Sequence, residues 1–139
     1  MATFNKFQCF VGDLGAKVHD LQASGDTLKV YLTNNTPDAA ADSVKADIVG
    51  ITEENGYAAA DIMNDWSKSG GTGTLTAVDV TWTASGGSFG PFRYVVIYND
   101  TPTSPEDPLV GWSNYGASIT CNDGETFKVD FEESLITIT

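Results

Sequence analysis

The amino-acid sequence predicts an all-β protein: an antiparallel β-sandwich or jelly-roll-like barrel of about seven to nine short strands, with one short N-terminal helix. Apolar and polar residues alternate with a period of two in several segments, as in strands with one buried face. Turn signals rich in Gly, Asn, Asp and Pro separate these segments at intervals of about ten residues. The 139 residues suit one domain and are too few for two ordinary ones.

The N-terminal segment has a helical pattern instead. Its apolar residues recur at spacings of three and four: Phe4, Phe7, Val11, Leu14, Val18 and Leu21. Gly12 and Gly15 disfavour a long helix, so we expect a short helix over about residues 3–13, followed by extended chain. We therefore divide the single domain into an N-terminal helix or arm, residues 1–21, and a β-sandwich, residues 22–139. The apolar face of the arm packs either on this domain or on a neighbouring subunit, and the sequence leaves both open.

Four segments make up the first half of the predicted sandwich. Residues 28–33 alternate cleanly and predict a half-buried strand. Residues 39–47 contain four Ala and predict a brief helical turn, and residues 57–68 are interpreted as a strand between Gly-rich flanks. Residues 75–83 predict a strand with three apolar residues on one face: Val78, Val80 and Trp82.

The second half opens with the most apolar run of the chain. Residues 92–98 are rich in Tyr, Val and Ile, which favours a central strand buried on both faces. Residues 101–108 hold three of the five prolines and predict a surface loop. Residues 109–112 and 118–121 predict two short strands around a turn at Tyr115 and Gly116.

The C-terminal residues predict a hairpin and a final strand. Asn122, Asp123 and Gly124 form a strong hairpin signal, because Gly, Asn and Asp tolerate a positive φ. In the strand at 125–131 the inward residues are expected to be Phe127, Val129 and Phe131. Residues 135–139 predict a strand that closes the chain.

Composition excludes two classes of partner. Nineteen acidic against seven basic side chains give a formal charge of −12, whereas binding to phosphate backbones requires clustered Lys and Arg. We therefore expect no nucleic-acid partner. We also expect no membrane partner, because no stretch approaches the ~20 apolar residues of a spanning helix. The first ten residues lack the charged start and apolar run of a secretory signal, so export by that route is not expected.

Residues that carry catalysis are sparse. A nucleophilic triad needs a base, usually a histidine, and His19 is the single histidine of the chain. We expect His19 to be exposed or to cap the helical segment. Glycosidases need two carboxyl groups about 5–10 Å apart, but adjacent acids in a strand point to opposite faces. We predict that the protein is not an enzyme and has no cofactor; loop carboxylates such as Asp100 and Asp123 leave a weak surface calcium site open.

The cysteines and tryptophans each have two interpretations. Cys9 and Cys121 match no zinc pattern and are either two buried apolar thiols or a disulfide that joins the ends of the chain. The alternation around Trp82 favours a place for the tryptophans in the core or in a subunit interface. Together with acidic neighbours, Trp66 and Trp112 could instead form a platform on which sugars stack.

Segments from most of the chain resemble a group of small tailed-bacteriophage virion proteins. The segments that carry the resemblance are FNKF at 4–7, DTLKV at 26–30, GPFRYVVIYND at 90–100, PLVGW at 108–112, Tyr115-Gly116 and DGETFKVDF at 123–131. The group has no catalytic motif to transfer, so the resemblance implies a component of a phage particle. Among small all-β proteins of this kind, capsid decoration (cement) proteins are the commonest role.

A decoration role implies a rigid β domain with a surface that binds across neighbouring capsid subunits, burying on the order of 1,000 Å² or more. For this assembly interface we predict the residues Phe4, Phe7, Phe10, Val11 and Trp112. The expected partners are the major capsid protein and further copies of this chain, as a homo-oligomer on the capsid surface of the virion. Deleting residues 1–14 is expected to abolish incorporation and leave a folded domain. The alternative is a tail, fibre or baseplate module that binds host-surface glycans.

Overall fold

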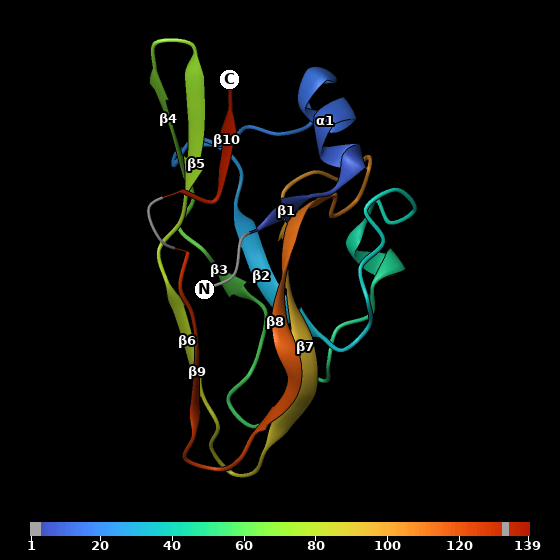
Figure 1. Ribbon diagram of the computed structural model, residues 1–139, viewed down its shortest axis with the longest axis vertical. Coiled ribbons are helices and arrows are strands. Elements are labelled where there is room, and N and C mark those ends of the chain that lie inside the picture. Colours follow the sequence, from blue (N-terminus) through green and yellow to red (C-terminus); the bar gives the residue numbers. More distant parts are fainter. Residues whose placement is uncertain (1–3, 132–133) are drawn as a thin grey trace.

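The strands of the protein form two facing layers, described by a computed structural model for residues 4–131 and 134–139 (Figure 1). One layer is a five-stranded antiparallel sheet of order β1-β8-β7-β2-β3. The other consists of a three-stranded sheet, β10-β5-β4, and a two-stranded sheet, β6-β9, which follow each other along the long axis. The protein is therefore an all-β sandwich with one short N-terminal helix, as the sequence predicts.

The elements of the described residues have the following bounds: β1 (Asn5–Lys6), α1 (Gln8–Gly15), β2 (Leu28–Thr33), the 3-10 helix η1 (Lys45–Asp47), β3 (Ala60–Asp61), β4 (Asp65–Ser69), β5 (Thr72–Thr76), β6 (Val80–Thr83), β7 (Phe89–Asn99), β8 (Leu109–Cys121), β9 (Thr126–Val129) and β10 (Ile136–Ile138).

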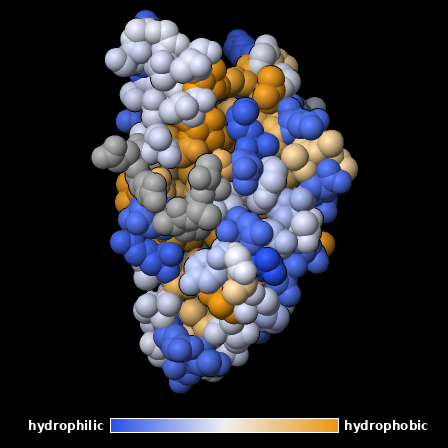
Figure 2. Space-filling model, viewed as in Figure 1, coloured by the Kyte–Doolittle hydropathy of each residue, from blue (hydrophilic) through white to orange (hydrophobic). Residues whose placement is uncertain are grey.

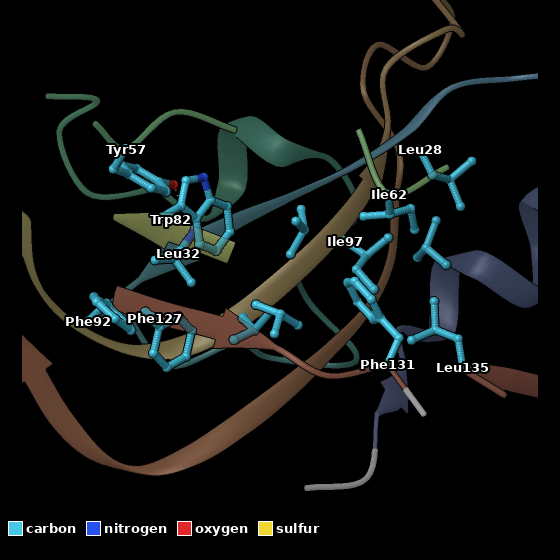
Figure 3. Packing of buried hydrophobic residues seen from close by; sticks show 14 of the residues in the cluster. Leu28, Leu32, Tyr57, Ile62, Trp82, Phe92, Ile97, Phe127, Phe131 and Leu135 are labelled. Carbon is cyan, nitrogen blue, oxygen red and sulfur yellow. Dashed lines mark hydrogen bonds between the residues drawn. The ribbon is translucent and has the colours of Figure 1, made fainter. Parts of the chain in front are cut away.

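The main core lies between the two layers, and strands of all three sheets contribute to it. Figure 3 shows an end rich in aromatic rings around Trp82, Phe92 and Phe127, and an end with more aliphatic residues around Ile62 and Ile97. At the aromatic end the ring centroids of Phe92 and Phe127 are 4.7 Å apart in an edge-to-face arrangement. The alternation in β9 is confirmed, because Phe127 and Val129 are buried and Lys128 between them is exposed.

A second apolar cluster, here called the outer cluster, is separate from the main core and includes Tyr31 of β2. It consists of Phe7, Tyr31, Ile48, Val96, Tyr98 and Leu109. In β2 the alternate residues Leu28, Val30 and Leu32 join the main core, whereas Tyr31 between them joins the outer cluster. The strand predicted to be half-buried is therefore covered on both faces. The central position of β7 between β8 and β2, with every residue from Tyr94 to Asn99 buried, is confirmed.

The N-terminal segment is part of the sandwich. The helix predicted over residues 3–13 begins only at Gln8, because Asn5 and Lys6 pair with β8 as strand β1. The Phe7 backbone N–H then donates to the carbonyl of Val110 at 3.1 Å. Phe10 of α1 belongs to the main core. Residues 5–15 thus complete the fold, and the division into an arm and a sandwich does not separate two independent parts.

Two strand predictions need correction. The strand predicted over residues 75–83 is interrupted after Thr76, where the chain passes from the three-stranded to the two-stranded sheet. Val78 in this crossing is 59% exposed, not inward, although its N–H donates to the carbonyl of Ile62. The strand predicted over residues 57–68 is split in the same way into β3 and β4, which lie in different sheets.

β8 is one long strand where two short ones and a turn are predicted. Its partner β7 pairs Phe92 with Ile119 and Tyr94 with Asn114, so four residues of β8 face a single residue of β7. The Tyr-Gly pair at 115–116 is accommodated in this bulge, with Gly116 at a φ of +97°. A turn signal in the sequence is therefore a local irregularity of a continuous strand.

The turn at Asn122–Gly124 forms as predicted, and Glu125 N–H donates to the Asn122 carbonyl at 2.8 Å. It does not make a hairpin, however, because β8 pairs with β7 whereas β9 pairs with β6. The turn therefore carries the chain from one layer to the other. In the described part of the chain, no helix is long and apolar enough to cross a membrane.

Candidate functional site

The five residues predicted for the assembly interface have different environments. Phe7 and Phe10 are 0% exposed. The Phe4 ring is partly buried, with its centroid 5.6 Å from that of Phe131. Trp112 is partly buried against the outer cluster, with its ring tilted relative to that of Phe7 and the centroids 4.8 Å apart, whereas Val11 on α1 is 60% exposed. Val11 and the accessible parts of Phe4 and Trp112 are therefore the members available to a partner.

The prediction must be corrected for Phe7 and Phe10. Both side chains fill apolar clusters of their own domain, so they cannot also bury their surface against another subunit. Deleting residues 1–14 would open both clusters and remove strand β1 from its sheet. A folded domain is not expected to remain, because emptying a buried Phe position destabilises by about 3–5 kcal/mol. Surface substitutions must replace the deletion as the test of this region.

A pocket of about 460 Å³ lies at the C-terminal end of helix α1, along the segment that connects α1 to β2 and beside Trp66 of β4. In Figure 1 this segment crosses the end of the sandwich behind β10 before it continues into β2. The apolar part of the wall consists of Leu14, Val18, Leu21 and Trp66. The polar part consists of Lys17, His19, Asp20, Gln22 and Asp26. The volume is within the ~300–1,000 Å³ typical of ligand pockets.

His19 is held in one chemical form by its neighbours. Asn99 accepts the Thr101 N–H through Oδ1, which orients its amide so that Nδ2 lies 3.0 Å from His19 Nδ1 and 2.8 Å from an Asp26 carboxylate oxygen. Because Nδ2 is a donor, His19 Nδ1 accepts and the ring proton is on Nε2. Burial lowers the pKa of His19, opposed by the charges of Asp13 and Asp26, so the neutral ring is favoured.

The expectation of an exposed or capping histidine is therefore wrong. His19 is 9% exposed and packs on Phe10, with ring centroids 5.2 Å apart. Its Nε2 is buried and has no hydrogen-bond partner among the residues that the structure describes. Residue spacing gave no signal for this environment, because the contact with Asn99 joins residues 80 positions apart.

The loop that forms the polar wall is closed by its own hydrogen bonds. The N–H of Asp26 donates to the Asp20 carbonyl at 2.8 Å, and the Asp20 N–H donates to an Asp26 carboxylate oxygen at 2.9 Å. Buried Asn64 donates to the carbonyls of Leu21 and Asp26 and fixes this loop to the sandwich. The pocket wall is thus preorganised by contacts with the fold.

Trp66 is the tryptophan that borders the pocket. A Cβ at Gly73 on the neighbouring strand would collide with the six-membered ring of Trp66, so the indole lies directly on the backbone of β5. Trp82 is in the main core and donates through Nε1 to the Ala58 carbonyl at 2.8 Å. Trp112 is partly buried and packs against the outer cluster. The three rings thus occupy separate places in the fold.

The cysteines are free thiols, Cys121 buried and Cys9 partly buried, so the disulfide alternative is not realised. Burial raises the pKa of Cys9 to about 11, with the negative charge of Asp13 adding to the effect. Burial also raises the pKa of Cys121. Both thiols are therefore protonated near neutral pH and poorly nucleophilic. Within residues 4–131 and 134–139, no group of three or more His, Cys, Asp or Glu side chains is placed to hold a metal ion.

Comparison with known proteins adds no identification: no family model, no curated protein and no solved structure matches the chain.

Proposed function

We propose that this chain is a structural protein of a tailed-phage particle, a capsid decoration protein that stabilises contacts between major capsid subunits. The sequence resemblance described above supports the phage particle as its place. The formal charge of −12 suits a protein present in many outward-facing copies, because mutual repulsion keeps such copies soluble. A sandwich with apolar clusters on both sides of β2 supplies the rigid body that such a role requires.

The observation that carries the proposed interface is the exposure of Val11 on a helix that is fixed to the sandwich. Phe7 just before the helix contacts Trp112 through a tilted ring pair, and Val11 lies about one helical turn further along the chain. Figure 2 shows further hydrophobic surface at this end of the molecule, between the β4–β5 hairpin and α1, on the side of the helix where the candidate pocket lies. An apolar side chain on a preorganised helix can bind a capsid subunit with little loss of conformational freedom.

Capsid binding by Val11→Asp tests the proposal directly. The substitution places a charge in the proposed apolar contact without touching either cluster, so occupancy on capsids should fall at least about tenfold. The matched control is Val49→Asp, because Val49 is 69% exposed and lies after η1, away from this helix. Both variants should retain the thermal unfolding of the native protein. Equal occupancy of Val11→Asp and native protein would exclude this interface.

Electron microscopy of labelled particles tests the location separately. Density for the label is expected on the outer capsid surface, at positions shared by neighbouring capsid subunits. Density on the tail or baseplate would overturn the decoration role and favour a tail module. Absence of the label from purified particles would overturn both.

A further inference from the structure

We propose that the pocket between the end of α1 and strand β4 is a binding site for a neutral pyranose sugar, with Trp66 as the stacking surface. This inference goes beyond a decoration role and does not depend on it. It rests on the pocket's volume, on the fixed position of one aromatic ring, and on the mixture of donors and acceptors in the wall. A pyranose ring has an apolar face of C–H groups and a rim of hydroxyls, so it needs these three features together.

The position of Trp66 is set by the neighbouring strand. Gly73 lacks a side chain, and the six-membered ring of Trp66 occupies the space that a Cβ would fill. The indole also packs against the main core while it contributes to the pocket wall. A ring held in this way loses little freedom when a ligand covers it.

The polar wall can satisfy hydroxyl groups, which both donate and accept hydrogen bonds. Asp20 uses Oδ1 for Gln22, and Asp26 uses Oδ2 for Asp20 and Asn99; the other oxygen of each carboxylate has further acceptor capacity. Donors come from the Lys17 ammonium and the Gln22 amide. His19 also lines the pocket, but its Nε2 is buried below the surface and presents no exposed donor to a ligand.

The same wall disfavours anionic ligands. Asp20 and Asp26, in a chain of net charge −12, repel phosphate and acidic sugars. Lys17 offsets part of the attraction that the two carboxylates and the aromatic ring exert on a quaternary ammonium ion, so such an ion is included among the probes as a competitor. A neutral sugar can place its apolar face on the apolar part of the wall and its hydroxyl groups on the polar part.

Binding is tested on the purified full chain by NMR, following backbone amides and the Trp66 indole N–H. The neutral probes are the methyl glycosides of glucose, galactose and mannose, and N-acetylglucosamine; the charged probes are inorganic phosphate, glucuronate and tetramethylammonium. At least one neutral probe should cause saturable shifts confined to the pocket, with a dissociation constant of about 1 mM or lower. The proposal is wrong if no neutral probe saturates, or if a charged probe binds more tightly than every neutral one.

Two glycines provide a matched pair of variants. Gly73→Ala places a methyl group where the Trp66 ring lies, so it should displace the ring and weaken binding at least about tenfold. Gly71→Ala, in the same hairpin, meets no atom within 4 Å and should bind like the native protein. Gln22→Ala removes an exposed polar contact and is expected to weaken binding without affecting folding. Equal binding by native protein, Gly73→Ala and Gln22→Ala would exclude the pocket as the site.

Discussion

The main core and the outer cluster differ in extent: both join strand residues to loop residues, but only the main core spans all three sheets. The main core takes residues from strands of all three sheets. The outer cluster joins strand residues such as Tyr31 and Val96 to Phe7, which precedes α1, and to Ile48, which follows η1. Loop residues are held by fewer ladder hydrogen bonds than strands and open at a lower free energy. The comparison predicts that a cavity in the main core destabilises the whole domain, whereas a cavity in the outer cluster first opens the loop that covers this cluster.

The largest effect is expected for Phe92→Ala. Phe92 is 0% exposed, with its ring 6.0 Å from that of Phe89 and 4.7 Å from that of Phe127, so the substitution leaves a cavity among aromatic rings. The free energy of unfolding should fall by about 3–5 kcal/mol. Denaturant unfolding measures the change, and half-exposed Tyr115→Ala is the control with a smaller loss. An equal loss for both variants would contradict the assignment of Phe92 to the main core.

A matched pair of isoleucines compares the two clusters directly. Ile62 in the main core and Ile48 in the outer cluster are 0% and 2% exposed, so truncation to Ala removes the same buried atoms. Within the range of about 2–5 kcal/mol for such changes, Ile48→Ala should lie at the lower end. Both residues lie outside strands, but the Ile48 N–H donates locally to the Lys45 carbonyl, so its loop can collapse onto the space, whereas the Ile62 N–H donates to the carbonyl of Leu28 in β2.

Hydrogen exchange separates the two responses to these isoleucine variants. Ile48→Ala should speed exchange in residues 34–56 and leave β7 protected. Ile62→Ala should reduce the protection of the sandwich as a whole. Identical exchange patterns for the two variants would show that the clusters unfold as one unit.

Tyr31→Phe should have a smaller effect. The Tyr31 hydroxyl donates to the Ile48 carbonyl at 2.9 Å and so fastens the loop over the outer cluster. Burial raises the pKa of Tyr31, so this hydroxyl remains a donor throughout the usual pH range. Its removal should lower the free energy of unfolding by about 1 kcal/mol. Tyr115→Phe, at a half-exposed ring, should change it by less than about 0.5 kcal/mol.

The smallest effect is a pH dependence outside both clusters. The pKa of His19 is lowered in the folded protein, so the unfolded chain binds the proton first as the pH falls through the ordinary value of 6.5. The free energy of unfolding should therefore decrease below about pH 6.5. The neighbouring charges of Asp13 and Asp26 oppose this change in part.

Urea unfolding at pH 7 and pH 5 provides the measurement for His19. His19→Gln removes the titrating ring, so the difference in free energy between the two pH values should be smaller than in native protein. Asp47 and Asp79, whose pKa values are lowered mainly by backbone N–H donors, contribute stability that is lost only at more acidic pH. An unchanged difference in His19→Gln would show that the buried ring is not the titrating group.

Much of the main core could be predicted from local pattern. The alternation of Leu28, Val30 and Leu32 and that of Phe127, Val129 and Phe131 identify core residues correctly. The candidate pocket could not be predicted in this way. The sequence offers Trp66 as a candidate sugar-stacking residue, but the position of its ring depends on Gly73 of β5, and the state of His19 depends on Asn99 of β7.

The sequence by itself determined the fold class, the central strand around Val95 and Val96, and the inward faces of several strands, because periodicity reports how neighbouring residues share a face. The tertiary structure decided that Phe7 and Phe10 are buried, that Tyr115 and Gly116 lie in a bulge, and that a pocket forms beside Trp66. These features depend on contacts between segments that are far apart in the sequence. Such contacts produce no periodic pattern of apolar and polar residues along the chain.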